Sequence, residues 1–255
     1  VVCDEKVFRM GEAAEFPFTT EKTSDGAAFV WKSPALEVRQ DFSFVASKDA
    51  TLPDGIRIKL TLKNTGEKDC RVGVRYLIDT HLGEPSGTHF STPLKERFDK
   101  EASVRPSETE NYFRSADPGD KEGAGLPVML KGDGVSPVEE VIFANWKRLT
   151  ETAWRYAVNP NRNFNLLPYS INDSAGCIYY AVETLKRGDT REISTVLGNV
   201  SGGNYKAVDG SGFSGLLLRM KGETAESAVS DPQEAMKAET QTREAFMKQL
   251  GTRLN

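Results

Sequence analysis

The stretch GIRIKLTLKN (residues 55–64) decides the fold, because apolar and polar residues alternate along it. Its apolar positions are Ile56, Ile58, Leu60 and Leu62. Since successive side chains of a β-strand point to opposite faces, this period of two predicts a strand with one buried and one solvated face. After the turn residues NTGEKD, the stretch CRVGVRYLID (residues 70–79) has a second apolar face. We therefore predict a β-hairpin made of these two strands.

Other parts of the chain show similar β-branched and aromatic runs, which are typical of short strands. ALEVRQDFSFV (residues 35–45) alternates in the same way. Further runs lie at residues 138–149, 152–158, 177–185, 190–198 and 213–220. Residues 84–137 are less periodic and rich in Gly, Pro and charge. A segment of this length is functional, is disordered or contains strands of its own.

The C-terminal end has a different pattern. In SDPQEAM, Asp231 can cap a helix and Pro232 suits its first position. We therefore predict an all-β protein, a large antiparallel β-sandwich, with one C-terminal α-helix. The sandwich domain is expected over residues 1–228. The helix is expected over residues 229–255, packed on the sandwich or extending from it.

Composition restricts the classes of partner. The chain has 255 residues, of which 38% are hydrophobic and 27% charged, as is typical of a globular protein. Its 33 basic and 37 acidic residues are intermixed without a basic stripe, which argues against nucleic acid as a partner. No apolar run approaches the ~20 residues of a membrane-spanning helix.

The cysteines and the start of the chain bear on its compartment. Cys3, Cys70 and Cys177 are far apart and form no CxxC pair, so neither a disulfide scaffold nor a zinc site is implied. We favour buried free thiols, with a Cys70–Cys177 disulfide as the alternative. The chain begins VVCDEKVFRM, without Met or an apolar leader. We expect a mature or trimmed chain from which any targeting signal has been removed.

Three segments together resemble a known group of proteins. They are IRIKLTLKNTGEKDCRVGVRYLIDTHLGE, then VIFANWKRL with TAWRY, and last YSINDSAGCIYYAVETLKRGDTREISTVLG. The resemblance extends over residues 28–198 and is to bacterial extracytoplasmic β-sandwich proteins of the galactose-mutarotase-like supersandwich type. It implies a large two-sheet fold and a periplasmic or cell-surface location. That fold serves sugar epimerases, non-catalytic carbohydrate modules and structural parts of larger enzymes, so it does not specify the chemistry.

Both histidines, His81 and His89, lie in RVGVRYLIDTHLGEPSGTHF, residues 71–90. An epimerase needs a His acid and a carboxylate base that face each other across a sugar. Either histidine is a candidate acid, and Glu84, Glu110 or Asp79 is a candidate base. We favour a structural interpretation, in which Asp79 and Thr80 end a strand.

In that structural interpretation, Arg75 pairs with Asp79 or with another carboxylate. Residues 71–90 are then primarily a core strand and only secondarily a candidate site.

Sugar-binding candidates concentrate in RYAVNPNRNFNLLPYS (residues 155–170), which is rich in Asn and Arg. Amides and guanidinium groups bond sugar hydroxyls, while aromatic rings pack on sugar CH faces. The candidate ligand-binding residues are Arg75, Asn161, Arg162, Asn163, Asn165 and Tyr169. An ordinary loop is the alternative for the Asn-rich run. We interpret Trp146 and Trp154 as core residues.

Several oxygen-bearing residues in turns are candidate calcium ligands. They are Asp79, Glu84, Asp133, Asn172, Asp173 and Asp209. No consensus calcium loop is present, and Asp and Asn are common in ordinary turns. Neither a Gly-rich phosphate loop nor a Gly-x-Ser-x-Gly elbow occurs. We therefore expect no metal or cofactor, with calcium as the alternative.

These observations favour a non-catalytic extracytoplasmic module that binds a glycan or a protein partner in the bacterial envelope. The first alternative is an aldose-epimerase-like enzyme with a His–carboxylate pair. The second is a structural component of an envelope assembly that docks through the helix predicted at residues 231–250.

Overall fold

The computed structural model describes residues 1–24, 26–50, 53–116, 125–198 and 205–208. All of them belong to one unit of the chain, Val1–Gly210. The strand predicted at residues 213–220 and the helix predicted at residues 229–255 lie outside the described residues. The domain boundary predicted at residue 228 lies outside them as well.

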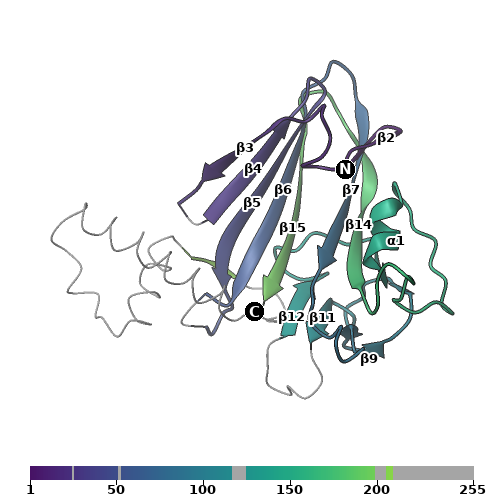
Figure 1. The fold of residues 1–255 in the computed structure, drawn as a ribbon. Coiled ribbons are helices and arrows are strands. Elements are labelled where there is room, and N and C mark those ends of the chain that lie inside the picture. The colour runs from purple at the N-terminus through teal and green to yellow at the C-terminus, as the bar shows by residue number, and fades with distance from the viewer. Residues whose placement is uncertain (25, 51–52, 117–124, 199–204, 209–255) are drawn as a thin grey trace, which may run out of the picture. The chain divides into compact units, whose positions relative to one another are not determined.

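Two antiparallel sheets form the described part of the chain (Figure 1). Sheet A contains, in spatial order, β10 (Ala102–Val104), β13 (Glu140–Asn145), β14 (Ser174–Leu185), β7 (Cys70–Asp79), β1 (Val2–Cys3) and β2 (Lys6–Val7). Sheet B contains, in spatial order, β3 (Phe18–Lys22), β4 (Gly26–Lys32), β5 (Leu36–Ala46), β6 (Gly55–Asn64), β15 (Thr190–Gly198), β12 (Gly125–Met129), β11 (Tyr112–Ala116), β8 (Phe90–Thr92) and β9 (Lys95–Phe98), with β16 (Lys206–Ala207) paired to β5. The predicted all-β antiparallel sandwich is confirmed.

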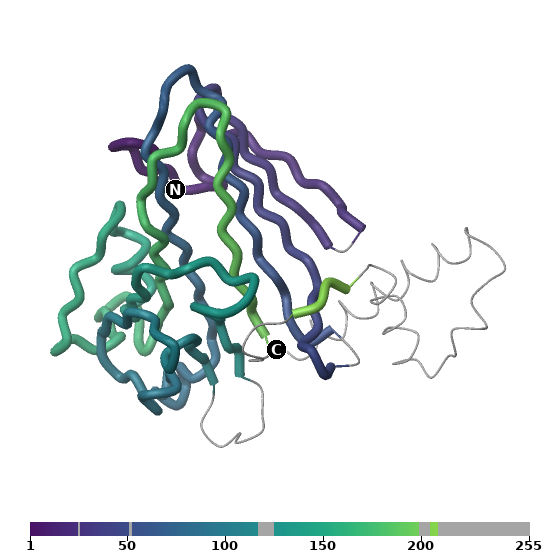
Figure 2. Tube along the Cα trace, turned by 180° about the vertical axis from the view of Figure 1, so that it is seen from behind, coloured from purple at the N-terminus to yellow at the C-terminus, as the bar shows by residue number. Residues whose placement is uncertain are grey.

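The two sheets face each other as two layers, seen from opposite sides in Figures 1 and 2. Leu60 and Leu62 of β6 belong to the same buried cluster as Val72 and Val74 of β7. These residues are on the apolar faces that the alternation predicted. Burial of these two facing surfaces is what joins the sheets, because apolar area removed from water stabilises the fold.

The predicted hairpin is wrong, although both of its strands exist. β6 pairs with β5 and β15 in sheet B, whereas β7 pairs with β14 and β1 in sheet A. The connection crosses from one layer to the other. The buried Asn64 stabilises this crossing, since its Nδ2 donates to Lys68 O (2.8 Å) and Leu185 O (2.9 Å). Its Oδ1 accepts from Gly66 N at 3.0 Å.

Aromatic rings fill one part of the core. Phe143 is fully buried, and its ring centroid lies 4.5 Å from Phe90, 5.0 Å from Phe98 and 5.2 Å from Phe113. Three of these four residues come from β8, β9 and β11, within the weakly periodic segment 84–137. The described part of that segment therefore contains strands of its own, which was one of the three alternatives predicted from the sequence.

The strand predicted over residues 138–149 ends earlier than expected. Asn145 Oδ1 accepts from Arg148 N (3.2 Å) and caps the short helix α1 (Trp146–Glu151). The strand predicted over residues 152–158 is wrong, because that segment has no strand structure. Its polar side chains bond other elements instead. Arg155, for example, forms ion pairs with Glu139 and Glu140, just before and at the start of β13.

The three cysteines are free, as favoured from the sequence; Cys70 and Cys177 are buried as expected, whereas Cys3 is partly exposed. A Cys70–Cys177 disulfide is excluded by the register of β7 and β14. Cys177 pairs with Leu77, and Cys70 pairs with Leu185. The two cysteines are therefore seven positions apart along the sheet, which is about 23 Å at ~3.3 Å per residue. A disulfide requires Cα atoms within about 7 Å.

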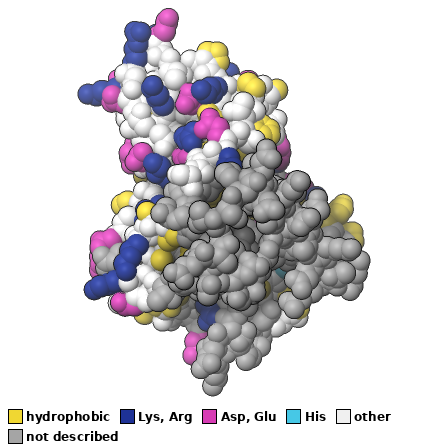
Figure 3. All heavy atoms as spheres, turned by 90° about the vertical axis from the view of Figure 1, so that its left-hand side faces the viewer, with side chains coloured by type: hydrophobic (Ala, Val, Ile, Leu, Met, Phe, Trp, Pro, Cys, Tyr) yellow, Lys and Arg dark blue, Asp and Glu magenta, His cyan; other side chains and the backbone are white. Residues whose placement is uncertain are grey.

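The outer face of sheet B is charged with both signs. Arg39 Nη1 lies 2.6 Å from Glu21 Oε2, and Lys32 Nζ lies 3.3 Å from Glu37 Oε2. Figure 3, viewed from the side of β3, shows basic and acidic side chains interspersed over the described residues. Among the residues that the structure describes, no helix has the length and apolar character needed to cross a membrane.

Candidate functional site

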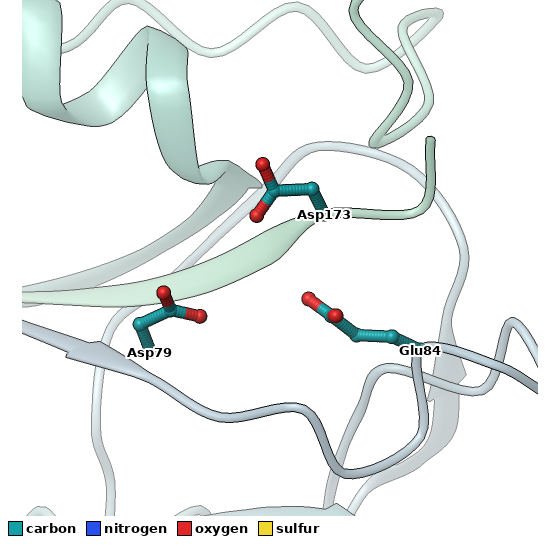
Figure 4. A group of neighbouring side chains, drawn as sticks. All are labelled: Asp79, Glu84 and Asp173. Carbon is teal, nitrogen blue, oxygen red and sulfur yellow. The ribbon is translucent and has the colours of Figure 1, made fainter. Parts of the chain in front are cut away.

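Three carboxyl groups meet at one end of sheet A (Figure 4). Asp79 ends β7, Glu84 lies in the following loop, and Asp173 directly precedes β14. The pairing of Asp79 with Ala175 brings Asp173 next to the end of β7. One carboxylate oxygen from each residue lies within 4.8 Å of the others. Oxygen ligands at this spacing could hold a divalent cation such as calcium.

Both carboxylate oxygens of Glu84 have partners, one at the start of β14 and one in the loop after β7. Oε1 accepts from Ser174 N at 2.7 Å, and Oε2 lies 3.1 Å from His81 Nδ1. Gly83 adopts a φ of +80°, and a Cβ there would lie 2.8 Å from Ala116 O. Only glycine satisfies both the dihedral angle and the space at this position.

The two histidines have different environments. His89 is 3% exposed, its Nδ1 lies 2.8 Å from Ser174 Oγ, and its ring packs 4.4 Å from Phe164. Burial, assisted by the charge of Arg97, lowers the pKa of His89 to about 4. His89 is therefore neutral near pH 7 and fixed by packing. His81 is largely exposed and pairs directly with Glu84.

This geometry bears on the epimerase hypothesis. The acid and base of such an enzyme lie on either side of a sugar, but His81 and Glu84 bond each other directly. Glu110 accepts from Thr92 Oγ1 at 2.6 Å. The structure therefore brings Asp79, Glu84 and His81 together, but the one direct histidine–carboxylate contact among the described candidates leaves no space for a substrate.

The carboxyl group of Asp79 has a perturbed acidity. Partial desolvation and the neighbouring charges of Glu84 and Asp173 raise its pKa from 3.8 to about 6, with His81 opposing the shift. Because the folded-state pKa exceeds the unfolded one, the proton bound by Asp79 stabilises the fold below about pH 4. This contribution is lost as the pH rises through 6.

Asp79→Asn should therefore stabilise the protein at pH 7.5 and have no effect at pH 4. We expect about 1 kcal/mol after solvent screening, or roughly 2–4 °C in Tm. Thermal unfolding of both proteins between pH 4 and 8 measures the difference. Asp49→Asn, at an exposed loop aspartate, is the control and should show no pH-dependent gain. An equal gain in Tm from Asp79→Asn at both pH values would contradict the claim that the charges of Glu84 and Asp173 destabilise ionised Asp79.

Two of the other calcium candidates, Asn172 and Asp133, lie in turns. Asn172 donates its backbone N–H to Asn165 Oδ1 at 2.7 Å and has a φ of +52°, as expected of a turn. Asp133 lies in a turn after β12. Asp209 lies outside the described residues.

Among the described residues, Arg75 pairs with no carboxylate, so this expectation of the structural interpretation is wrong for the part of the chain that the structure describes. Its guanidinium group donates to Leu149 O and Thr152 O, both at 2.5 Å, and to Cys177 Sγ at 3.0 Å. The carbonyl groups at the end of a helix have no partners within the helix. Arg75 therefore fastens the end of α1 to the outer face of β7.

In the Asn-rich run, several Asn side chains bond the backbone of their own loop. Asn159 Oδ1 accepts from Asn161 N, and Asn163 Oδ1 accepts from Asn165 N, both at 3.1 Å. Bonds of this kind to the backbone two residues ahead are Asx turns. Tyr169 is 73% exposed, with Lys147 Nζ 5.4 Å from its ring.

A buried carboxylate, that of Glu101, anchors the Asn-rich run. Glu101 accepts from Tyr156 Oη (2.7 Å), Asn159 N (3.0 Å) and Arg148 Nη1 (3.2 Å). Arg162 Nη1 is 3.6 Å from it, so this candidate ligand-binding residue is engaged in the fold. The role of Glu101 was not predicted from the sequence, since it lies in the weakly periodic segment.

A cleft that the sequence did not predict lies at the edge of sheet A. Its volume is about 1020 Å³. One wall is the inner face of β4–β6, and the floor is β7 from Val74 to Leu77. Parts of residues 6–15 and 146–154 form the remaining walls. This edge cleft exists because sheet B continues through β5, β4 and β3 beyond the end of sheet A.

The edge cleft combines aromatic surface with a few polar groups, as ligand sites do. Gln40 Nε2 donates to Tyr76 Oη at 2.6 Å across the two sheets. Trp31 is 6% exposed, and its buried indole N–H has no acceptor in the structure. Because buried polar groups are nearly always bonded, an acceptor that reached this donor would bind favourably.

The two other tryptophans also line the edge cleft. Trp146 is 38% exposed, so its interpretation as a core residue is wrong. Trp154 is partly buried and packs edge-on against Tyr179, with ring centroids 5.9 Å apart.

Comparison with models of protein families gives no match, and comparison with curated proteins gives none either. The family that the sequence resembles therefore stays an expectation.

Proposed function

We propose that the chain is a non-catalytic binding module whose ligand, a glycan or a protein partner, occupies the edge cleft. The observation that carries the proposal is the unpartnered indole N–H of Trp31 in a cleft lined by aromatic rings. A ligand oxygen would complete this hydrogen bond, while apolar parts of the ligand pack on the rings.

The arrangement of titratable groups supports binding over epimerase catalysis. In the edge cleft, Arg75 is already bonded to backbone carbonyls, and Tyr76 is bonded to Gln40. Burial raises the pKa of Tyr76 further above its ordinary value, which makes it a poor proton donor at neutral pH. Turnover of a simple aldose that disappears in a variant with both histidines changed to Ala would overturn the proposal.

The location of this module in the periplasm or at the cell surface is part of the proposal. That location rests on the sequence resemblance alone, as does a role in the bacterial envelope. A structural role in an envelope assembly would depend on the helix predicted at residues 231–250.

Trp31→Phe is the variant that tests the site. A thermal-shift screen with oligosaccharides and extended peptides should first find ligands, since about 100-fold excess over Kd adds ~2.7 kcal/mol of stability. The variant retains an aromatic ring but loses the N–H, so we expect affinity to fall about tenfold, the value of one hydrogen bond. Isothermal titration measures the change.

The control is Phe164→Leu, a buried aromatic position outside the edge cleft. It should lower Tm but leave ligand affinity unchanged. Equal affinity of wild type and Trp31→Phe would place the ligand elsewhere. A screen without any ligand from either class would refute the binding function.

A further inference from the structure

We propose, building on the proposed function, that the occupant of the edge cleft is an extended peptide segment of a partner protein. The segment adds as an antiparallel strand to the free edge of β7. The proposal rests on three features of the described residues: an unpaired strand edge, the direction of its backbone groups and the character of the cleft walls.

The edge of β7 is only partly covered. β1 pairs with β7 at Val2–Gly73 and Cys3–Val72, and no strand of the described residues pairs with positions 74–79 on that side. The floor of the edge cleft is formed by Val74 to Leu77. The uncovered edge and the cleft floor are therefore the same stretch of chain.

The backbone groups at this edge point alternately to the two sides. Asp4 N donates to Arg71 O at 2.7 Å, so Arg71 directs its carbonyl toward β1. Neighbouring residues of an antiparallel strand face opposite partners, so Gly73, Arg75 and Leu77 point the same way. The N–H and C=O groups of Arg75 and Leu77 consequently face the edge cleft, whereas those of Val74 and Tyr76 face β14.

This row of groups matches a peptide better than a sugar. A donor and an acceptor recur at every second residue, about 6.8 Å apart, and an extended backbone presents the complementary row at the same spacing. Sugar hydroxyls have no such repeat. β1 already binds the neighbouring part of the same edge in the antiparallel direction, and the added segment would continue its line.

The walls define the side chains of the segment. Alternate residues would face inward toward Trp31, Gln40 and Leu60, where the Trp31 N–H needs an acceptor. The others would face Trp146 and Thr150. We therefore assign the segment apolar residues at alternate positions, with a hydroxyl or amide oxygen within reach of the Trp31 indole.

The test follows amide hydrogen exchange by NMR. In the free protein, the amides of Arg75 and Leu77 should exchange faster than those of Val74 and Tyr76. The probes are acetylated nonapeptides with Val or Ile at alternate positions, Thr at the others and Lys at both ends. The two central inward residues are varied through all amino acids.

The best-binding peptide should slow exchange at Arg75 and Leu77 about tenfold or more and leave Val74 and Tyr76 unchanged. N-methylation of the peptide amides that face β7 should abolish binding. N-methylation of the alternate amides is the matched control and should be tolerated.

Slow exchange of Arg75 and Leu77 in the free protein would overturn strand addition, as would peptide binding that survives both methylation patterns. Oligosaccharides that bind through Trp31 while no peptide binds would refute this inference and leave the proposed function standing. Failure of both classes would refute both.

Discussion

Replacement of Glu101 by Gln is expected to lower the free energy of unfolding by about 3–5 kcal/mol, as for other buried ion pairs that lose one partner. Glu101 is 2% exposed and accepts hydrogen bonds from Tyr156, Asn159 and Arg148. The amide of Gln preserves the shape but removes the charge. It also turns one acceptor into a donor that faces other donors.

The loss should also loosen the loop that Glu101 anchors. Arg148 donates to Asn163 O and Asn165 O as well, so its position links Glu101 to the Asn-rich run. Urea unfolding measures the free energy. Glu108→Gln is the matched control, because Glu108 is exposed and pairs only at the surface with Lys131. It should cost less than about 1 kcal/mol. Similar costs for both variants would contradict the anchoring role.

Phe143→Ala should destabilise the protein by a comparable amount, about 3–5 kcal/mol. The ring of Phe143 lies at the centre of the aromatic core and contacts Phe90, Phe98 and Phe113. Truncation leaves a cavity that the surrounding strands cannot fill, because packed interiors relax only partially. The measurement is again urea unfolding.

Where Phe143→Ala does not fold, Phe143→Leu provides the milder test and should still cost more than about 1 kcal/mol. Phe18→Ala is the control, since Phe18 is 51% exposed at the edge strand β3. It should cost about 1 kcal/mol or less. If the Phe143 variant lost no more free energy of unfolding than the Phe18 variant, the aromatic core would not be a main source of stability.

Sequence periodicity predicted the strands well and their partners poorly. The alternation in β6 and β7 reports that each has one apolar face. That face is buried as expected except at Ile56, which is exposed near the start of β6. It contains no information on whether the next strand lies beside the first or opposite it. Both arrangements bury the same side chains, so the crossing at residues 65–69 was interpreted as a hairpin turn.

The carboxylate cluster was partly predictable. Asp79 and Glu84 are close in sequence, and Asp173 was among the candidate calcium ligands. Their meeting depends on the pairing of β7 with β14, which joins residues about a hundred positions apart. Contacts of this range are invisible to local patterns.

The edge cleft was not predicted, because it results from the different widths of the two sheets. One signal was present. Gln40 occupies a polar position on the otherwise apolar face of Leu36, Val38 and Phe42, and it proves to lie inside the cleft. A polar residue that interrupts the inner face of a strand is therefore worth examining as a site residue.

The crossing between β6 and β7 also has a consequence for synthesis of the chain. Apart from its short contact with β1, β7 pairs with β14, which ends at Leu185. About a hundred residues separate the two strands, which at ~5–20 residues per second is roughly 5–20 s of translation. During that time the apolar faces of both sheets are only partly buried, because later strands have not yet been made. A nascent chain released before Leu185 lacks part of the main partner of β7, so its apolar surface stays open to aggregation.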